Sequence, residues 1–380
     1  MPEVSKLLWS LNLDIGEISQ KTGIPSSRIA EILELEKIQF GELRALARGL
    51  RLPLNSFAEG KRPVDSSDEL NLLFRSAGEF YDELEPTKEF VANYVQAALD
   101  VLPKKNKAPD WLETIPKVDQ TAEEAENLAN FVRDLFYGPD SINPLTDLAV
   151  VLSKAGSVVV GKLRNSKYEG VSLIAGNRPF IFVSPRFPAR MLFTLAHELG
   201  HILAHHIHKP GVLFERPSQI ASMSPKRKKD ESFVDMFAAS LLLPAQGVGR
   251  MLKSIKETYN TENALVGDIE LLLLARFYGV SFEVAGIRCE NLGLLPSGAT
   301  RAIYESLKGD FGSPEKRADQ VGLPKRATVL FPELSPELTN EIVSNIYDGN
   351  ISSGWVSDKF GLSLSKIYSL HKEMIHENHS

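Results

Sequence analysis

The sequence of 380 residues contains a single cysteine, Cys289. One cysteine excludes an internal disulfide and any metal site made of several thiolates, and it is consistent with a reducing compartment. We expect Cys289 to be a small core residue rather than a nucleophile. A metal bound by this chain would therefore be held by histidine and carboxylate side chains.

Long apolar runs are also missing. No segment approaches the roughly 18 residues that cross a bilayer, and the first residues lack the basic and apolar regions of a signal peptide. We therefore expect a cytoplasmic protein with no membrane partner. Hydrophobic residues make up 43% of the chain and charged residues 24%, as in soluble globular proteins. The length predicts roughly two to four domains.

The most informative motif is the His-Glu-x-x-His of residues 197–201. Positions i and i+4 of a helix lie on one face, so His197 and His201 can bind one metal ion, with Glu198 beside them to take a proton from water. The mostly apolar residues 191–203 favour a helix buried against a core. Two imidazoles and a carboxylate base are the minimum of a zinc peptidase site. The alternative is a histidine-rich helix that binds no metal.

A catalytic zinc usually has a third protein ligand, and the nearby histidines are His205, His206 and His208. His205 continues the same face, but on a straight α-helix it lies roughly 12 Å from His197 along the axis, too far for bonds of about 2 Å. The metzincin pattern requires a third histidine where this chain has Ile207. Neither route supplies the third ligand.

A better source is residues 230–244, an apolar helix that ends at Pro244. Glu231 and Asp235 are spaced i, i+4 on this helix. An unpaired carboxylate on a buried helix is costly, so we expect Glu231 to be the third metal ligand and Asp235 to accept a hydrogen bond from a metal-binding histidine. Asp230 is the second candidate ligand. The alternative places both acids on a solvated face, because acids are favoured at helix starts.

Two segments resemble the ImmA/IrrE family of metallopeptidases: Thr194 to His201, and the alanine-rich helix that ends in Leu241-Leu242-Leu243-Pro244. Residues 274–281 and 292–295 are similar to the helical tail of that family, so the resemblance covers residues 120–295.

The resemblance implies a zinc-dependent endopeptidase whose usual target is a transcriptional repressor. Carried over by position, it assigns His197, His201 and Glu231 as ligands and Glu198 as the base. The family usually has asparagine where this chain has Asp235, so the role of Asp235 rests on the helix pattern.

The first 60 residues are expected to be helical. A helix over 15–22, a turn at Gly23 and a second helix over 25–33 resemble the Xre type of helix-turn-helix domain, in which Ser26, Ser27 and Arg28 would face DNA. The net charge of −6 argues against nonspecific coating of nucleic acid but leaves a local DNA-reading surface open. The alternative is a helical bundle that binds no DNA, because acids at 31, 34 and 36 would repel phosphates.

Short β-branched or aromatic runs at 157–160, 171–174 and 179–183 predict a small antiparallel sheet directly before the metal helix. Peptidases of this class bind extended substrates along the edge of such a sheet, where backbone hydrogen bonds form. The expected fold is α+β and mostly helical, with a zincin-like core flanked by helix-turn-helix-like modules. The expected domains are an Xre-like domain at 1–60, a helical linker region at 61–118, the metallopeptidase domain at 119–295 and a C-terminal helical module at 296–380.

Three segments share a corner in which a helix, a glycine, an apolar residue and a second helix follow one another: 21–25, 277–281 and 359–363. Their irregular spacing favours independent helix-turn-helix corners over a repeat array. The third corner lies inside 336–374, which is compact enough for a second DNA- or protein-binding module.

Our first hypothesis is a cytoplasmic regulator that binds one Zn²⁺ per chain and cleaves a specific protein, a repressor, with DNA as a second partner of residues 1–60. The rival hypothesis is a DNA-binding transcriptional regulator or antitoxin-like protein whose metal domain senses or docks a partner without cleaving it.

Overall fold

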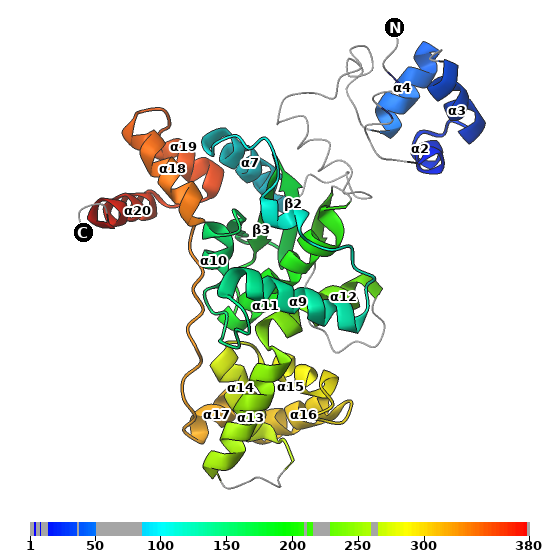
Figure 1. Cartoon of the computed structure of the whole chain (residues 1–380). Coiled ribbons are helices and arrows are strands. Elements are labelled where there is room, and N and C mark those ends of the chain that lie inside the picture. Colours follow the sequence, from blue (N-terminus) through cyan, green and yellow to red (C-terminus); the bar gives the residue numbers. More distant parts are fainter. Residues whose placement is uncertain are drawn as a thin grey trace. The chain divides into compact units, whose positions relative to one another are not determined.

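The computed structural model of the chain (Figure 1) describes Val4, Leu8 and residues 14–35, 38–50, 86–208, 211–215, 229–259 and 265–377. Contacts divide the chain into two compact units, Met1–Leu99 and Asp100–Ser380. The helix α7 (Pro86–Val101) spans the boundary between them in sequence. Among the described helices, none is by itself long and apolar enough to cross a membrane; only a pair bent by 51°, Ser232–Leu242 with Ala245–Thr258, meets the length and composition criteria jointly.

Among the described residues of the first unit, three short helices precede α7: α2 (Ile15–Thr22), α3 (Ser26–Leu35) and α4 (Phe40–Gly49). Asp14 begins α2 with a capping box, and Gly23 ends it at φ 71°, a left-handed conformation that glycine adopts without strain. The apolar faces of the helices form a separate small core that includes Ile18, Ile29, Ile32 and Leu46. The predicted helix, glycine turn and second helix are therefore present, while membership of the Xre type stays a prediction.

The second unit contains a four-stranded sheet of β1 (Val159–Lys162), β2 (Gly170–Ala175), β3 (Arg178–Val183) and β4 (Val212–Glu215). The strand order is β1-β3-β2-β4. Strands β2 and β3 are antiparallel, as are β2 and β4, but β1 pairs with β3 in parallel. The expectation of an antiparallel sheet was wrong in this respect, since the sheet is mixed.

The connections explain the mixed sheet. Gly176 and Asn177 join β2 to β3, both with positive φ (53° and 59°), as a two-residue type I′ hairpin requires. Residues 163–169, between β1 and β2, are too many for such a turn. The two strands are therefore separated, and β3 lies between them, parallel to β1.

Helices around this sheet position the site: α9 (Ala122–Tyr137), α10 (Leu148–Lys154), α11 (Pro188–His201), the π-helical turn η1 (Ile202–His206) and α12 (Lys229–Leu242). Helix α11 packs on β2 and β3 and also on α12, which packs on α9. Figure 1 shows α9, α11 and α12 lying together beside the sheet. The largest hydrophobic core lies between these layers and includes Leu195, Leu199, Val234 and Phe237.

Two buried arginines hold the C-terminal end of α12. The Arg133 guanidinium donates to the carbonyl oxygen of Leu241, and Arg288 Nε donates to that of Leu243 at 2.8 Å. Unpaired carbonyl groups at a helix end are costly when buried, so these contacts fix where α12 ends.

The remaining helices are α8 (Asp110–Glu113), α13 (Ala245–Tyr259), α14 (Asp268–Tyr278), α15 (Phe282–Asn291), α16 (Ala299–Phe311), α17 (Pro314–Gln320), α18 (Pro336–Tyr347), α19 (Ser353–Phe360) and α20 (Leu364–Glu377). Gly279 and Gly361 join α14 to α15 and α19 to α20 at φ 74° and 65°. Both predicted corners are confirmed as backbone turns, and partner binding by the third stays a prediction. The buried Arg178 of β3 pairs with Glu337 at 2.9 Å, which ties α18 to the sheet.

Candidate metal centre

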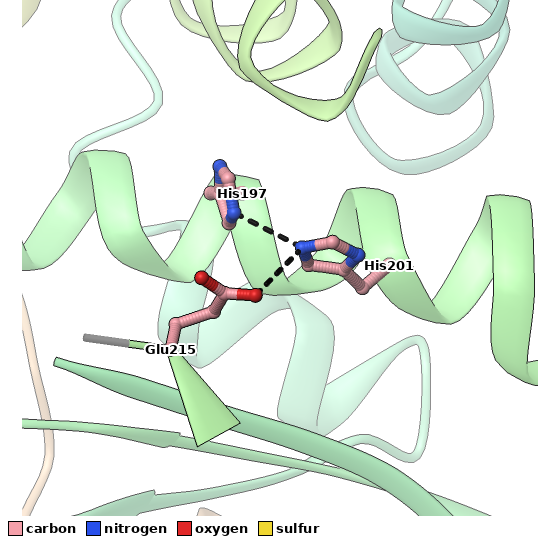
Figure 2. Close-up of side chains that lie close together, drawn as sticks. All are labelled: His197, His201 and Glu215. Atoms are coloured by element: carbon pink, nitrogen blue, oxygen red, sulfur yellow. Dashed lines mark hydrogen bonds and ion pairs between the residues drawn. The ribbon is translucent and has the colours of Figure 1, made fainter. Parts of the chain in front are cut away.

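The histidines of the motif lie on one face of α11, as predicted. Pro188 occupies the first turn of this helix, where a missing N–H costs nothing, and the helix is buried along most of its length. The Nε2 atoms of His197 and His201 lie 3.0 Å apart (Figure 2). Both residues are at most 1% exposed. Two ring nitrogens therefore converge at one buried point.

The opposite ring nitrogen of His197 contacts α12. His197 Nδ1 donates to Asp235 Oδ1 at 2.9 Å. This is the contact that we expected of Asp235, and it fixes the proton of His197 on Nδ1 and leaves Nε2 for a metal. What Asp235 does for a bound metal stays a prediction.

A carboxylate that the sequence did not single out completes a group of three ligand atoms. Glu215, the last residue of β4, is buried, and its Oε1 lies 3.6 Å from His201 Nε2 (Figure 2). Within the described parts of the chain, atoms of His197, His201 and Glu215 all lie within 4.8 Å of one another. Ligands of tetrahedral zinc are separated by about 3.4 Å. The three side chains therefore fit a zinc-sized ion.

Glu231, the expected third ligand, lies in the first turn of α12, but its side chain is outside the described residues, as is that of Asp230. Its backbone position is one helical turn before Asp235, on the side of α12 that reaches His197. The role of Glu231 as a metal ligand therefore stays a prediction, and Glu215 is a second candidate for the same role.

Glu198, the expected base, is completely buried. Its carboxyl group lies against Gly170 at the start of β2, the residue paired with Glu215 in the β2–β4 register. The preceding residue, Glu169, is held by both nitrogens of the Arg190 fork at 2.7 Å. The base is therefore enclosed between α11 and the end of the sheet.

Beyond His201 the α-helix continues as the π-helical turn η1. The π-helical turn η1 brings His205 Nδ1 to 3.0 Å from His201 Nδ1, on the ring edge opposite His197. Among the described residues, His205 is not part of the group of three ligand atoms, and its exclusion from the ion stays a prediction. The regular α-helix assumed for residues 202–206 was wrong, because they form a π-helical turn. His206 points instead to the sheet, where its Nε2 lies 3.2 Å from Ser172 Oγ.

Burial determines the protonation of these histidines. It lowers the pKa of His201 well below its usual value, with further lowering by His197 and the neighbouring histidines. Burial also lowers the pKa of His206 to about 3. A neutral imidazole is the form that binds metals, so His201 is ready to coordinate at neutral pH.

Of the expected DNA contacts, Ser26 and Ser27 are exposed at the start of α3. Arg28 is turned toward acids of its own unit: its Nε lies 2.7 Å from Glu42, and a terminal nitrogen lies 2.6 Å from Glu31. These hydrogen bonds raise the pKa of Arg28 above its usual value. DNA binding by these residues stays a prediction, and for Arg28 it requires giving up two ion pairs.

Comparison with known proteins agrees with this geometry over part of the chain. No curated protein matches the sequence. Residues 153–290 match the model of the Peptidase_M78 family, the IrrE N-terminal-like domain. This match covers the sheet, the His-Glu-x-x-His helix and α12, and it contains all three ligand atoms of the buried group. The chain therefore carries an IrrE-like metallopeptidase domain.

Proposed function

We propose that this protein is a zinc-dependent endopeptidase that acts in transcriptional regulation by cleaving one specific protein, a repressor. The observation that carries the proposal is the convergence of His197 and His201 at 3.0 Å, with the buried Glu198 between them in sequence. The metallopeptidase domain supports the reaction class. The repressor target is supported by the resemblance to the ImmA/IrrE family and by the helical modules on either side of the domain.

His197, His201 and a carboxylate would hold the zinc, which when bound would polarise the scissile carbonyl and make a water molecule more acidic. Glu198 then accepts the proton of the attacking water and passes it to the leaving amine. Its burial keeps bulk water from competing for that proton. Asp235 keeps the His197 ring in the required tautomer.

Two carboxylates are candidates for the third ligand. Glu215 is supported by its distance of 3.6 Å from His201 Nε2. Glu231 is supported by the family resemblance and by its place one turn before Asp235. A site that used both would leave little room for water, so we propose that one of them acts as ligand during catalysis.

The substrate would bind as an added strand. Among the described strands, β4 pairs only with β2, and its last residue is Glu215 at the metal centre. An extended peptide along the outer edge of β4 would make backbone hydrogen bonds there and reach the ligands. Because such pairing needs an unfolded segment, the target would present its cleavage site in a loop or linker.

The test is to co-express the chain with the proteins encoded beside it and to look for fragments that disappear when metal is removed. Glu198→Gln is the matched control, because the amide keeps size and shape but cannot accept the proton. We expect zinc content and folding to stay unchanged while the fragments vanish. Cleavage that persists in Glu198→Gln would reject the proposal.

The rival function is a DNA-binding regulator whose metal domain senses or docks a partner. The glycine corner between α2 and α3 is the observation that favours it. A DNA mobility shift with wild type and a Ser26→Ala/Ser27→Ala variant tests the contact itself. If Glu198→Gln performs every regulatory task of the wild type, the rival function replaces the peptidase.

A further inference from the structure

An extended segment joins α17 to α18 in the second unit. Residues 323–335, which we call the strap, form neither helix nor strand, and in Figure 1 they are the orange trace between the two helices. The strap lies beyond the region that matches the peptidase family, which ends at residue 290. Its contacts nevertheless reach β1, the start of α11 and α14, which are all inside that region.

The first part of the strap is held by the buried Arg276 of α14. Arg276 Nη1 donates to the carbonyl oxygens of Leu323 and Pro324 at 3.1 and 3.0 Å. The carbonyl oxygen of Arg276 accepts from the N–H of Ala327 at 2.8 Å. The other terminal nitrogen of Arg276 pairs with Asp319 of α17. The strap is therefore fixed to α14 through its main chain, and α17 is fixed at the same point.

Arg326 of the strap contacts three other elements. Its Nη1 donates to the carbonyl oxygens of Ala275, at 2.8 Å, and Val280, on either side of the glycine corner between α14 and α15. Its Nη2 pairs with Glu315 of α17. Its guanidinium carbon lies 5.2 Å from the ring centre of Phe187, the residue that precedes α11. One side chain therefore joins the strap, the glycine corner and the start of the metal helix.

The glycine corner is a second point at which the strap and α11 meet. A Cβ atom at Gly279 would lie 3.5 Å from Val329 Cγ2 of the strap and 3.7 Å from Leu192 Cδ2 of α11. The next residue of the strap, Leu330, donates its N–H to the carbonyl oxygen of Thr146 at 2.7 Å. The strap and the first half of the metal helix therefore pack on the same corner.

The far end of the strap is held by the sheet. Glu333 pairs with Lys162 of β1 at 2.9 Å and with Arg164, two residues after β1, at 3.2 Å. The pair of Arg178 with Glu337 fixes α18 to β3 directly after the strap. The strap is therefore anchored at α14 and at β1, and its contacts with the start of α11 lie between these two anchors.

We infer that the strap belongs to the peptidase domain and holds the start of α11, and through this helix the metal ligands. Packed interiors transmit displacements, so a loosened start of α11 disturbs His197 and His201 on the same helix. The module α18–α20 follows the far end of the strap, so a partner that pulled this module away would act on the metal centre. The effect on the metal rests on the proposed function, whereas the contact with α11 does not.

The direct test is amide hydrogen exchange of the full-length protein without metal. Phe187→Leu removes the ring beside Arg326 and leaves the contacts of the strap with α14 in place. The amides of Arg190 and Met191 donate to the carbonyl oxygen of residue 187, so they report the opening of the helix start. We expect them to exchange about 3- to 10-fold faster, as the loss of a cation–ring contact predicts, with no change at Ala327. Unchanged rates at Arg190 and Met191 overturn the inference.

Arg326→Gln tests the strap itself. We expect faster exchange at Ala327 and also at the start of α11, because this variant loses the contacts with α14 and with Phe187 together. The matched control is Lys325→Gln, which removes an exposed cation of the same strap and should leave both rates unchanged. Thermal unfolding shows whether each variant is folded, and Phe187→Leu decides the inference if Arg326→Gln is not. Faster exchange in Arg326→Gln at Ala327 alone overturns the inference.

Zinc affinity, measured by competition with a chelating dye, tests the link to the metal centre. We expect Phe187→Leu and Arg326→Gln to bind zinc about 2- to 30-fold more weakly than wild type, and Lys325→Gln to bind it equally well. Because coupling is reciprocal, zinc should slow exchange at the start of α11 and at Ala327 in the wild type. Unchanged affinity in both folded variants overturns the link to the ligands while the peptidase proposal stands. If the wild type binds no zinc, the proposed function fails, and the exchange rates still decide whether the strap holds the helix.

Discussion

Gly170 lies directly against the side chain of Glu198. A Cβ atom at Gly170 would be 2.7 Å from Glu198 Cδ and 2.8 Å from Cγ, closer than carbon atoms approach without displacement. Glu198 is buried between the helix and the sheet, so its carboxyl group has little room to move aside. The glycine therefore creates the space in which the base is held.

Gly170→Ala should displace the Glu198 carboxylate and reduce cleavage of the protein target by about 100-fold, as a misplacement of about 1 Å does in other enzymes. Zinc content should be unchanged, because neither proposed histidine ligand touches Gly170. Parallel measurement of bound zinc and of the cleavage rate separates the two effects. Gly249→Ala is the matched control: Gly249 is exposed in α13 (Ala245–Tyr259) with no atom near its Cβ position, and the change should be neutral or slightly stabilising.

Purified protein should contain about one zinc per chain, and His197→Ala or His201→Ala should each remove it, because a site with two remaining ligands binds zinc weakly. Elemental analysis after dialysis measures this. Full zinc in both variants would mean that the metal binds elsewhere.

The third ligand can be assigned by comparing Glu231→Ala with Glu215→Ala. We expect Glu231→Ala to weaken zinc affinity more than Glu215→Ala, and Asp235→Ala to weaken it about 10- to 100-fold through the orientation of His197. Competition titrations with Zn²⁺ measure all three. The reverse order for the two glutamates would assign Glu215 as the ligand and leave Glu231 outside the site.

His206 should make the metal-free protein sensitive to acid. Its pKa is about 3 in the folded protein and near 6.5 when unfolded, so between these values only the unfolded chain binds the proton. The free energy of unfolding therefore falls as the pH falls, by on the order of 1 kcal/mol per pH unit in this window. His206→Gln, which has no titrating ring, should lose about 2 kcal/mol less than wild type between pH 7 and pH 5 in urea unfolding. Equal losses would show that His206 does not contribute.

The sequence was most informative where a local spacing determines the chemistry. The i, i+4 rule is sufficient to place His197 and His201 together, and the glycine corners at Gly23, Gly279 and Gly361 follow from local backbone preference. Glu215 could not be found in this way. It is brought to the site by the pairing of β4 with β2, and a four-residue strand after a helix has no distinctive pattern.

Two other features also depend on contacts or hydrogen-bond patterns that leave no distinctive local pattern in the sequence. The parallel pairing of β1 with β3 depends on which strand fills the centre of the sheet, which alternation of side chains does not reveal. The π-helical turn at η1 depends on a change of one residue in the hydrogen-bond pattern, and residues 202–206 look like a continuation of the α-helix. His201 and His205 are spaced i, i+4 like His197 and His201, so the spacing allowed their contact, but the sequence did not indicate the π-helical turn in which it is made.

The strand order also places a residue of the proposed metal centre, Glu215, on an edge strand of the sheet. Strand β4 comes after α11 in the chain and lies at the edge of the sheet, where among the described strands β2 is its one partner. Its release would remove Glu215 and leave β1, β3 and β2 paired. Amide hydrogens of Val212 to Glu215 should therefore exchange with solvent faster than those of Phe180 to Phe182 in the metal-free protein, and zinc should slow them if Glu215 binds it. The side of the centre that a substrate strand would approach is thus also the side on which we expect the sheet to open most readily.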